Sequence, residues 1–527
     1  MAQELRKVTF ALSFPQGFFP DVKYVPVSPS ERTCDAIDCA YNESTEKINI
    51  GKTLSYKGID MTIKNVNEYA FCDNPFIKEV NLSFDGKLSD NAFHGCTNIT
   101  NVIVQNAGNI GNYAFSGINT ECTVIVNNKG TIGSNAFYND IGLKTLEIGE
   151  NVTDIASGAF SGCTNLETAN LQNKGKIADY VFKNCSAMKT VTLGEGITSI
   201  GQYAFDGCKK LQSIVIPDSV TSLGSYAFNN CRSMTSVKMG TGIMEINNGT
   251  FSECNSLMDM QIGNNVATIG TYAFSNCTAL PKIEIPQSVT KIEDYVFRGC
   301  KSFKEVVMAD RKHEDIDLTL GSNGSNPLFT DCPLDSVYIG RNISYSTSSS
   351  YGYSPFYRNT SLRSVTITDK ETEISPNEFY GCTNLKNVSI RDGVEIIGDW
   401  AFSGCSSLDY FAFGSNVKTI GKEAFSDCTA MTRLISRAAT PPTCGSQALD
   451  DINKWNCTLS VPTGAITSYQ QAAQWKDFFF INDDVTGISK LTNTVAFPNH
   501  IYDMNGRKLK EPSKGINIIG RKKVVVK

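Results

Sequence analysis

Histidine is nearly absent from this chain of 527 residues, and its only examples are His94, His313 and His500. These three residues lie far apart in the sequence. No stretch contains an H-E-x-x-H pair, a nucleophile elbow, a dinucleotide-binding fingerprint or a calcium-binding loop. The residue types that usually perform catalysis or hold a metal ion are therefore not gathered in a recognisable pattern. The sequence predicts a protein that is not an enzyme and that needs no cofactor.

Long apolar runs and an excess of one charge are also lacking. No stretch approaches 18 consecutive apolar residues, so no transmembrane helix is predicted. The net charge is −5 and 19% of the residues are charged, which argues against nucleic acid as a partner. Residues 1–4 contain no hydrophobic signal segment. Two interpretations stay open, a cytosolic protein or a mature form whose leader peptide was removed, and the resemblances given below favour the second.

What the sequence does contain is a phenylalanine that recurs about every 23 residues, usually after an alanine. Twelve of these phenylalanines are followed three residues later by a cysteine. A fixed period of this length indicates a solenoid, in which each repeat buries its apolar face only against its neighbours. The recurring positions are Phe71, Phe93, Phe115, Phe137, Phe160, Phe182, Phe205, Phe228, Phe251, Phe274, Phe297, Phe329, Phe356, Phe379, Phe402 and Phe425.

The repeat that runs from residue 208 to 231 shows how one turn is built. Leu211, Ile214 and Ile216 alternate with polar residues, which predicts a short strand. Pro217 ends that strand, because proline has no backbone donor. The chain then turns and places Phe228 in the core. Stacked in register about 4.8 Å apart, such strands form a parallel sheet, and the bulkier turns bend the stack so that the sheet lies on the concave side.

This pattern resembles the leucine-rich repeats of the BspA-like bacterial surface proteins. The resemblance covers roughly residues 47–450. It implies a right-handed leucine-rich-repeat superhelix, a location outside the cell or on its outer surface, and a role in binding. The matching residues of one repeat are Leu211, Ile214, Ile216, Pro217, Val220, Leu223, Gly224, Ala227, Phe228 and Cys231.

The chain divides into four predicted regions. Residues 1–66 are expected to form a leader and a β-hairpin cap, and residues 67–450 a solenoid of about 16 repeats. Residues 451–486 read as a C-terminal cap with a helix, and residues 487–527 as a small β unit. This last unit resembles the C-terminal β domains of secreted Bacteroidetes proteins, in the segments 502–507 and 514–519. Two interpretations of it stay open, a sorting or attachment domain and a solvated hairpin whose basic edges resist pairing.

The eighteen cysteines do not read as a disulfide framework. Twelve occupy one position of the repeat, where stacked side chains point the same way and a disulfide has unfavourable geometry. These cysteines are expected to be reduced and to act as small buried apolar residues. The pairs Cys34/Cys39 and Cys444/Cys457 lie outside that column and are the better candidates for disulfide bonds.

Two insertions interrupt the repeats, at residues 309–327 and 341–355. Both follow a strand, so they are expected to project from one rim of the sheet. The second is rich in tyrosine and serine, as protein-binding loops often are. The alternative is a surface insertion that a solenoid tolerates at little cost. The candidate ligand-binding residues are Arg311, His313, Tyr345, Tyr351 and Tyr353 on the insertions and Tyr338 and Tyr410 on the outward face of the strands.

Together these observations predict a non-catalytic, adhesin-like protein of a bacterial surface. It would bind a host or cell-surface macromolecule, in the first place a protein, through the sheet and the two insertions. A glycan-binding surface protein and a structural spacer without a specific ligand are the alternatives.

Overall fold

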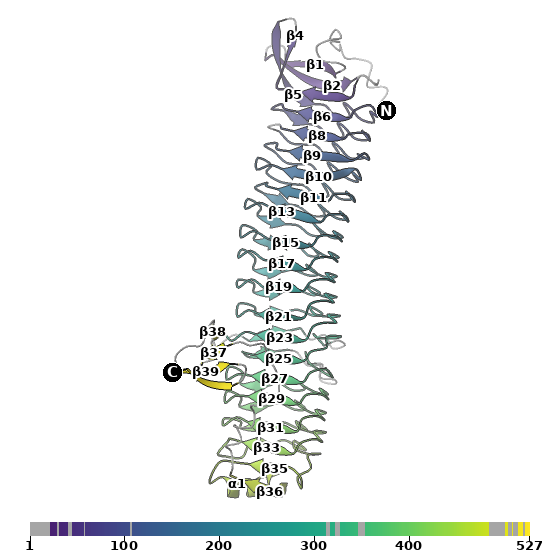
Figure 1. Cartoon of the computed structure of the whole chain (residues 1–527). Helices are drawn as coiled ribbons and strands as arrows, with labels where there is room; N and C mark the ends of the chain where they lie inside the picture. Colours follow the sequence, from purple (N-terminus) through teal and green to yellow (C-terminus); the bar gives the residue numbers. More distant parts are fainter. Residues whose placement is uncertain are drawn as a thin grey trace.

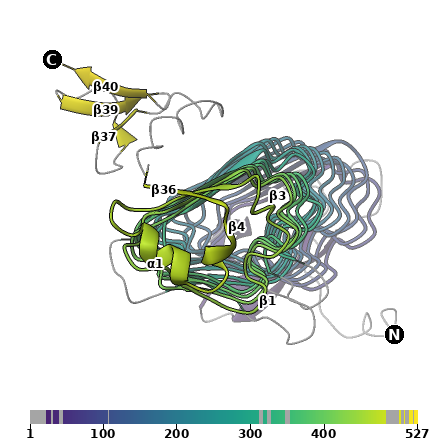
Figure 2. The ribbon, with the colours of Figure 1, turned by 90° about the horizontal axis from the view of Figure 1, so that it is seen from below.

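The computed structural model describes residues 22–28, 31–39, 45–56, 58–105, 108–311, 317–321, 327–345 and 354–483, together with four short strands between residues 501 and 526. Its main body is an elongated, gently bent column of stacked turns (Figure 1). The column has about 17 turns and almost no helix, which confirms the predicted repeat solenoid. Viewed along its length, the turns superimpose as one elongated ring (Figure 2).

Each turn contributes one short strand to a main parallel sheet, because its alternating apolar residues point into the column. In register, Val306 pairs with Val337, Val337 with Val365 and Val365 with Val388. The strands of this sheet are β3 (Lys47–Ile50), β6 (Glu79–Leu82), β8 (Asn101–Val104), β9 (Cys122–Val126), β10 (Leu143–Ile148), β11 (Thr168–Leu171), β13 (Thr190–Leu193), β15 (Ser213–Val215), β17 (Ser236–Lys238), β19 (Asp259–Gln261), β21 (Lys282–Ile285), β23 (Glu305–Met308), β25 (Ser336–Ile339), β27 (Ser364–Ile367), β29 (Asn387–Ile390), β31 (Tyr410–Phe413), β33 (Arg433–Ser436), β35 (Thr458–Ser460) and β36 (Phe480–Asn482).

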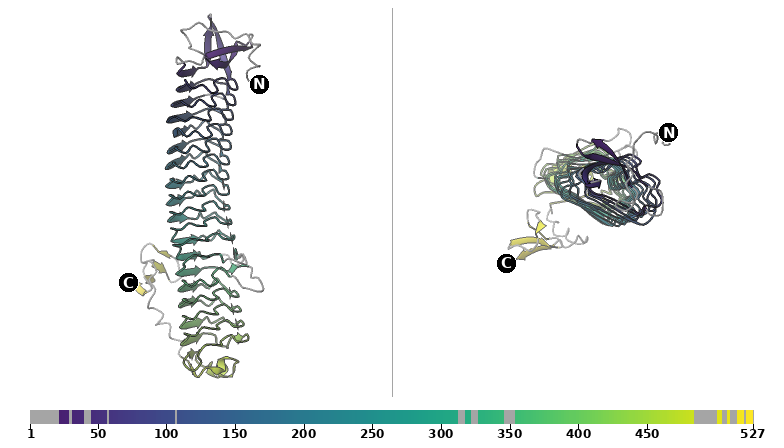
Figure 3. Two further views of the ribbon diagram at one scale, coloured as in Figure 1. Left: turned by 90° about the vertical axis from the view of Figure 1, so that its right-hand side faces the viewer. Right: turned by 90° about the horizontal axis from the view of Figure 1, so that it is seen from above.

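A second series of very short strands runs parallel to the main sheet. In profile, the main strands lie along one edge of the column and the turn segments along the opposite edge (Figure 3). Single bridges at Ile110, Ile132 and Ile155 continue the series where no strand forms. Its members are β7 (Lys87–Leu88), β12 (Lys176–Ile177), β14 (Ser199–Ile200), β16 (Ser222–Leu223), β18 (Glu245–Ile246), β20 (Thr268–Ile269), β22 (Lys291–Ile292), β24 (Leu318–Leu320), β26 (Ile343–Ser344), β28 (Glu373–Ile374), β30 (Ile396–Ile397), β32 (Thr419–Ile420) and β34 (Thr443–Cys444).

The recurring phenylalanines form one continuous stack through the core, from Phe71 to Phe425. Consecutive ring centroids lie 4.7 Å (Phe71 and Phe93) to 6.0 Å (Phe274 and Phe297) apart. All sixteen rings are buried. The predicted phenylalanine core is thus confirmed, and it takes the form of a ladder in which each ring packs on the ring of the turn before it and the turn after it.

The twelve repeat cysteines form a second buried column, and none of the eighteen cysteines, all of which lie among the described residues, forms a disulfide bond. Each repeat thiol donates to the carbonyl of the preceding turn's phenylalanine, as Cys231 does to Phe205 at 3.3 Å and Cys332 to Phe297 at 2.9 Å. Burial raises the pKa of the Cys382 thiol to about 12. The two pairs proposed as disulfides, Cys34/Cys39 and Cys444/Cys457, are not joined by disulfide bonds in this structure.

The N-terminal cap contains two antiparallel pairs of strands. β1 (Val22–Ser28) and β2 (Thr33–Cys39) form an antiparallel pair, and β4 (Thr53–Tyr56) with β5 (Ile59–Val66) forms a second one. β2 and β5 join in parallel, and β5 continues into β7. Residues 47–50 were expected in the cap, but they form the first strand of the main sheet, because this register turns Ile48 and Ile50 inward.

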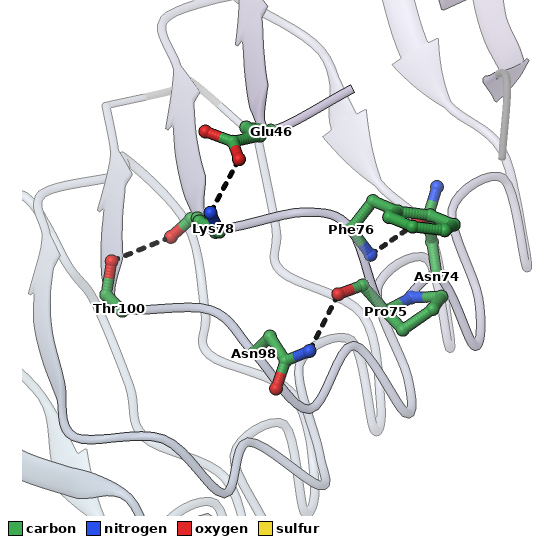
Figure 4. A network of polar contacts seen from close by, with 7 residues as sticks. All are labelled: Glu46, Asn74, Pro75, Phe76, Lys78, Asn98 and Thr100. Atoms are coloured by element: carbon green, nitrogen blue, oxygen red, sulfur yellow. Dashed lines mark hydrogen bonds and ion pairs between the residues drawn. The ribbon is translucent and has the colours of Figure 1, made fainter. Parts of the chain in front are cut away.

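Side chains that reach back to the previous turn lock the first turns together (Figure 4). Asn98 Nδ2 donates to the carbonyl of Pro75 at 2.8 Å, and Thr100 Oγ1 to that of Lys78 at 3.1 Å. Lys78 Nζ in turn pairs with Glu46 at 2.5 Å. The two hydrogen bonds supply donors to the carbonyls of Pro75 and Lys78.

The lower end of the column is closed by α1 (Ile466–Gln471) and the short 3-10 helix η2 (Trp475–Asp477), which cross the last turns (Figure 2). Tyr469 and Trp475 are buried there, and the indole Nε1 donates to the carbonyl of Pro442 at 2.8 Å. Beyond this cap, β37 (Ile501–Asp503), β38 (Lys508–Leu509), β39 (Gly515–Ile519) and β40 (Lys522–Val526) form an antiparallel sheet. Among the described helices, neither is long and apolar enough to cross a membrane.

Candidate binding sites

The outward face of the main sheet is accessible only over part of the column. Thr168, Thr190 and Ser213 are exposed on the upper strands. On β31 and β33 the outward positions are covered, since Ala412 is 6% and Ile435 0% exposed. The open face therefore ends before β31.

One polar patch stands out on the lower part of this open face. Tyr338 projects from β25, and its hydroxyl donates to the carboxylate of Asp310, 3.1 and 3.2 Å from the two oxygens. Desolvation raises the pKa of Asp310, and the nearby carboxylate of Asp369 adds to the effect while Arg391 opposes it. We call Asp310, Tyr338, Asp369 and Arg391 the Tyr338 patch.

Tyr410 lies further along the sheet, on β31, and is half-buried. Burial raises its pKa, against the influence of Arg437 and Arg433. Its hydroxyl and the Nε atom of Arg437 are both buried without a hydrogen-bond partner. Tyr410 therefore belongs to the covered end of the sheet and not to the Tyr338 patch.

Arg341, the first residue of the second insertion, is a buried residue that sequence analysis overlooked and that has a structural role. Arg341 is 2% exposed, and its guanidinium donates to the carbonyls of Val289 at 2.7 Å, Pro286 at 2.9 Å, Gln287 at 3.2 Å and Ile285 at 3.3 Å. Burial, with the nearby charge of Arg311, lowers its pKa to about 10. The candidate Arg311 is half-buried beside it. The candidate His313 lies outside the described residues.

At the second insertion, Tyr345 packs against the core, and its hydroxyl donates to the carbonyl of Pro376 at 3.3 Å. The candidates Tyr351 and Tyr353 lie outside the described residues. An open cavity of about 480 Å³ adjoins Tyr345. It is lined by Lys291, Ile292, Glu293, Asp294, Thr319, Leu320, Gly321, Ser344 and Tyr345.

Two glutamates are buried close to this insertion, at positions where regular repeats have valine and alanine. Glu371 accepts from the backbone of Ile343 at 3.4 Å and Glu378 from that of Ser375 at 2.7 Å. Among the described residues, one oxygen of each carboxyl has no hydrogen-bond partner. Burial raises the pKa of Glu378 to about 8, and burial together with Glu378 raises that of Glu371 well above its ordinary value. Within the described residues, no three potential ligands are grouped so as to hold a metal ion.

Sequence analysis also overlooked a series of half-exposed tyrosines on the turn side, which we call the tyrosine ladder: Tyr180, Tyr203, Tyr226, Tyr272 and Tyr295. Each precedes a core phenylalanine by two residues, and this spacing was the signal available in the sequence. Tyr180, Tyr203 and Tyr226 stack on one another at 5.4 and 5.0 Å, and Tyr272 and Tyr295 at 5.0 Å. Lys183 Nζ lies 5.2 and 5.1 Å from the rings of Tyr180 and Tyr203.

Comparison with known proteins agrees with the fold. A family model described as a BspA type leucine-rich repeat region matches residues 64–188, 175–304 and 350–450, which together make up more than half of the chain. No curated protein matches the chain.

Several solved structures are similar to this chain. A leucine-rich repeat protein from Bacteroides ovatus is 22% identical, with a TM-score of 0.45 over 88% of this chain and 98% of its own. A leucine-rich cell surface protein from Faecalibacterium prausnitzii is 20% identical, with a TM-score of 0.35 over 73% of this chain and 95% of its own. The pneumococcal vaccine antigen PcpA is 16% identical, with a TM-score of 0.35 over 73% of this chain and 98% of its own.

Proposed function

Since the chain belongs to the BspA-type leucine-rich repeat family, we propose that it is a non-catalytic, adhesin-like binding protein of a bacterial surface, or one secreted from it. Its partner is a macromolecule of a host or of a neighbouring cell, in the first place a protein. The open part of the main sheet and the adjoining insertions at 309–327 and 341–355 form the binding face.

The observation that carries this proposal is the Tyr338 patch. It combines an aromatic side chain with carboxylates and a guanidinium on a rigid, already formed strand surface. Tyrosine and arginine are the residue types that most often dominate protein interfaces. A preformed surface also loses little conformational freedom on binding, so that several weak contacts are enough for useful affinity. Tyr338 lies between the two insertions in the sequence, Asp310 belongs to the first insertion, and Asp369 and Arg391 follow the second.

The experiment begins with the immobilised full chain and protein fractions from mammalian extracellular matrix and mucus. A captured protein is then purified, and its affinity is measured by surface plasmon resonance for the native chain, for Tyr338→Ala and for Asp310→Ser. Loss of a central interface residue of this kind is expected to weaken binding about tenfold. Tyr380→Ala serves as the matched control, because Tyr380 stacks on Tyr357 on a turn and away from the main strands.

An unchanged affinity of both patch variants would exclude this face. Binding that survives protease treatment of the fractions but not removal of their glycans would favour the glycan-binding alternative. A chain that captures nothing would favour the structural spacer.

A further inference from the structure

The tyrosine ladder has a gap at Gly249. A Cβ atom at this position would lie 2.2 Å from Cε1 of Tyr226, so only glycine lets the ring of Tyr226 lie over this backbone. Successive turns are about 4.8 Å apart, and Tyr272 is two turns from Tyr226. The two rings are therefore separated by about 10 Å, which is the spacing at which one further flat ring fits between them.

The backbone at this column makes the choice of tyrosine unusual. The residues here have a positive φ, such as 58° for Tyr226 and 60° for Tyr272. This left-handed conformation suits glycine and asparagine, and the chain uses Asn91, Asn135 and Asn377 at equivalent positions. A bulky residue strains the backbone in this conformation, so another contact is needed to offset the strain. Ring stacking supplies such a contact for every member of the ladder, including Tyr226 on Tyr203 and Tyr272 on Tyr295. Tyr226 and Tyr272 are each stacked on one side only and flank the turn of Gly249.

The surroundings of the gap are polar and cationic. A cavity of about 600 Å³ extends from Tyr226 along the turns to Asp331. Arg298 and Lys301 line it, are exposed, and make no ion pair within the described part of the chain. Asp331 is the only acidic residue of this lining, so the lining carries a net positive charge in a chain whose overall net charge is −5.

We propose that this cavity, which we call the notch and which Tyr226 and Tyr272 both line, binds a carboxylated pyranose at the end of, or within, an acidic oligosaccharide. The apolar face of the sugar ring packs between Tyr226 and Tyr272, as flat rings pack on aromatic faces. The carboxylate pairs with Arg298 and Lys301 through charge-assisted hydrogen bonds. Asn276, which also lines the cavity, faces the sugar hydroxyls. The lining residues of the notch stand in turn segments and not in the main strands. The turn segments run along the edge opposite those strands (Figure 3), so this site is separate from the proposed protein-binding face.

Two pairs of probes test the proposal with the full chain. Sialyllactose is compared with lactose, and a tetrasaccharide of alternating glucuronic acid and N-acetylglucosamine with the neutral chitotetraose, by calorimetry and saturation-transfer NMR. We expect the acidic member of at least one pair to bind and its neutral partner to bind at least about tenfold more weakly, with affinity falling as salt is raised. The pair that responds identifies a sialic acid or a uronic acid as the source of the carboxylate.

Four variants locate the site. Gly249→Asn keeps a residue suited to the left-handed backbone but places side-chain atoms where the Tyr226 ring lies. Tyr272→Ala removes one wall, and Arg298→Gln removes a charge. Each is expected to weaken the acidic probe about fivefold to tenfold. Tyr380→Ala is the control and should bind as the native chain does. Absence of binding by both acidic probes at millimolar concentration, equal binding of the neutral probes, or binding that the notch variants leave unchanged would each overturn the proposal.

Discussion

The column contains a regular segment, between Phe160 and Phe297, and an interrupted segment, between Phe297 and Phe379. The two segments share one architecture but differ in the residues that fill their core. In the first segment the turns follow one another every 22 or 23 residues, and their inward positions are filled mainly by apolar residues and the cysteine column, with a few polar exceptions such as Asn173 and Thr250. In the second segment two insertions break the period, and Arg341, Glu371 and Glu378 are buried. The stack nevertheless continues, with ring centroids 5.5 Å apart for Phe297 and Phe329 and 5.3 Å for Phe329 and Phe356.

The comparison shows that the stack continues across an insertion as long as the strands of neighbouring turns stay in register, even though the length of the repeat changes. The carbonyl at one turn position illustrates the difference. In regular turns an asparagine of the next turn donates to it, as Asn265 does to Thr241 at 2.7 Å and Asn416 to Asp392 at 2.8 Å. The equivalent carbonyl of Gln287 lies above the first insertion and accepts from Arg341 instead. A long side chain thus replaces the contact that the interrupted turn no longer provides.

The largest effect is expected from the phenylalanine ladder. Phe228→Ala in the regular segment and Phe356→Ala in the interrupted one should each destabilise the column by about 3–5 kcal/mol, because both leave a cavity in the core. Urea unfolding followed by circular dichroism gives the two values. A Phe356 variant with a much smaller loss would mean that the interrupted segment packs more loosely, and the ladder would then not be one continuous structure.

The next largest effect is expected from Arg341→Met. The apolar side chain fills part of the space but leaves the carbonyls of Gln287 and Val289 without their donor, and each buried unpaired acceptor costs about 1–3 kcal/mol. Hydrogen exchange measured by mass spectrometry should show faster exchange around β21, β23 and β25. The matched change in the regular segment, Asn265→Leu, removes one exposed donor and should cost less than about 1 kcal/mol.

The glutamate pair makes the interrupted segment sensitive to pH. The folded pKa of Glu378 is raised to about 8, so its contribution to stability is complete below the ordinary pKa of 4.5 and is lost as the pH rises through about 8. The nearby carboxylates act in the same direction as burial, since Glu373 raises the pKa of both Glu371 and Glu378 and Asp317 raises that of Glu371. Burial raises the pKa of Tyr345, so its hydroxyl carries no charge in this pH range. A double Glu371→Gln and Glu378→Gln variant should therefore exceed the native chain in stability at pH 8 by at least about 1.4 kcal/mol, the equivalent of one pKa unit.

Thermal unfolding at pH 5 and pH 8 measures this difference. At pH 5 the advantage of the double variant should shrink, because the native carboxyls are then largely protonated. An advantage of equal size at both pH values would contradict the assignment.

The smallest effect is expected from a single member of the cysteine column. Cys231→Ala in the regular segment removes the bond to the carbonyl of Phe205 and one buried sulfur atom, and should cost about 1 kcal/mol. Cys382→Ala, which faces Phe356 at the end of the interrupted segment, should cost the same, because both thiols donate at 3.3 Å. Unequal losses by urea unfolding would show that the column differs between the two segments.

The solenoid, its phenylalanine core and its reduced cysteines could be predicted from the sequence, because each of these residues contacts the residue at the same position of the next turn. The period alone then specifies the neighbour. The N-terminal cap was predicted less well, since Val22 to Ser28 carry no repeat pattern and pair with β2 only in the folded chain. Of the candidate site residues, Tyr338 lies in a polar patch on the open sheet, Tyr345 packs toward the core and Tyr410 lies where the sheet is covered.

The sequence by itself thus determined the repeating part of the protein. This part is a one-dimensional stack in which each core residue packs on the equivalent residue of the next turn. Only the tertiary structure decided the arrangements at the places where the repeat is broken. One is the guanidinium of Arg341, which donates to carbonyls that precede it by 52 to 56 residues. Another is the cavity beside the turn of Gly249, which Tyr226 and Tyr272 line. The physical reason is that a periodic contact is encoded by position within one repeat, whereas these arrangements depend on how several turns are placed in space.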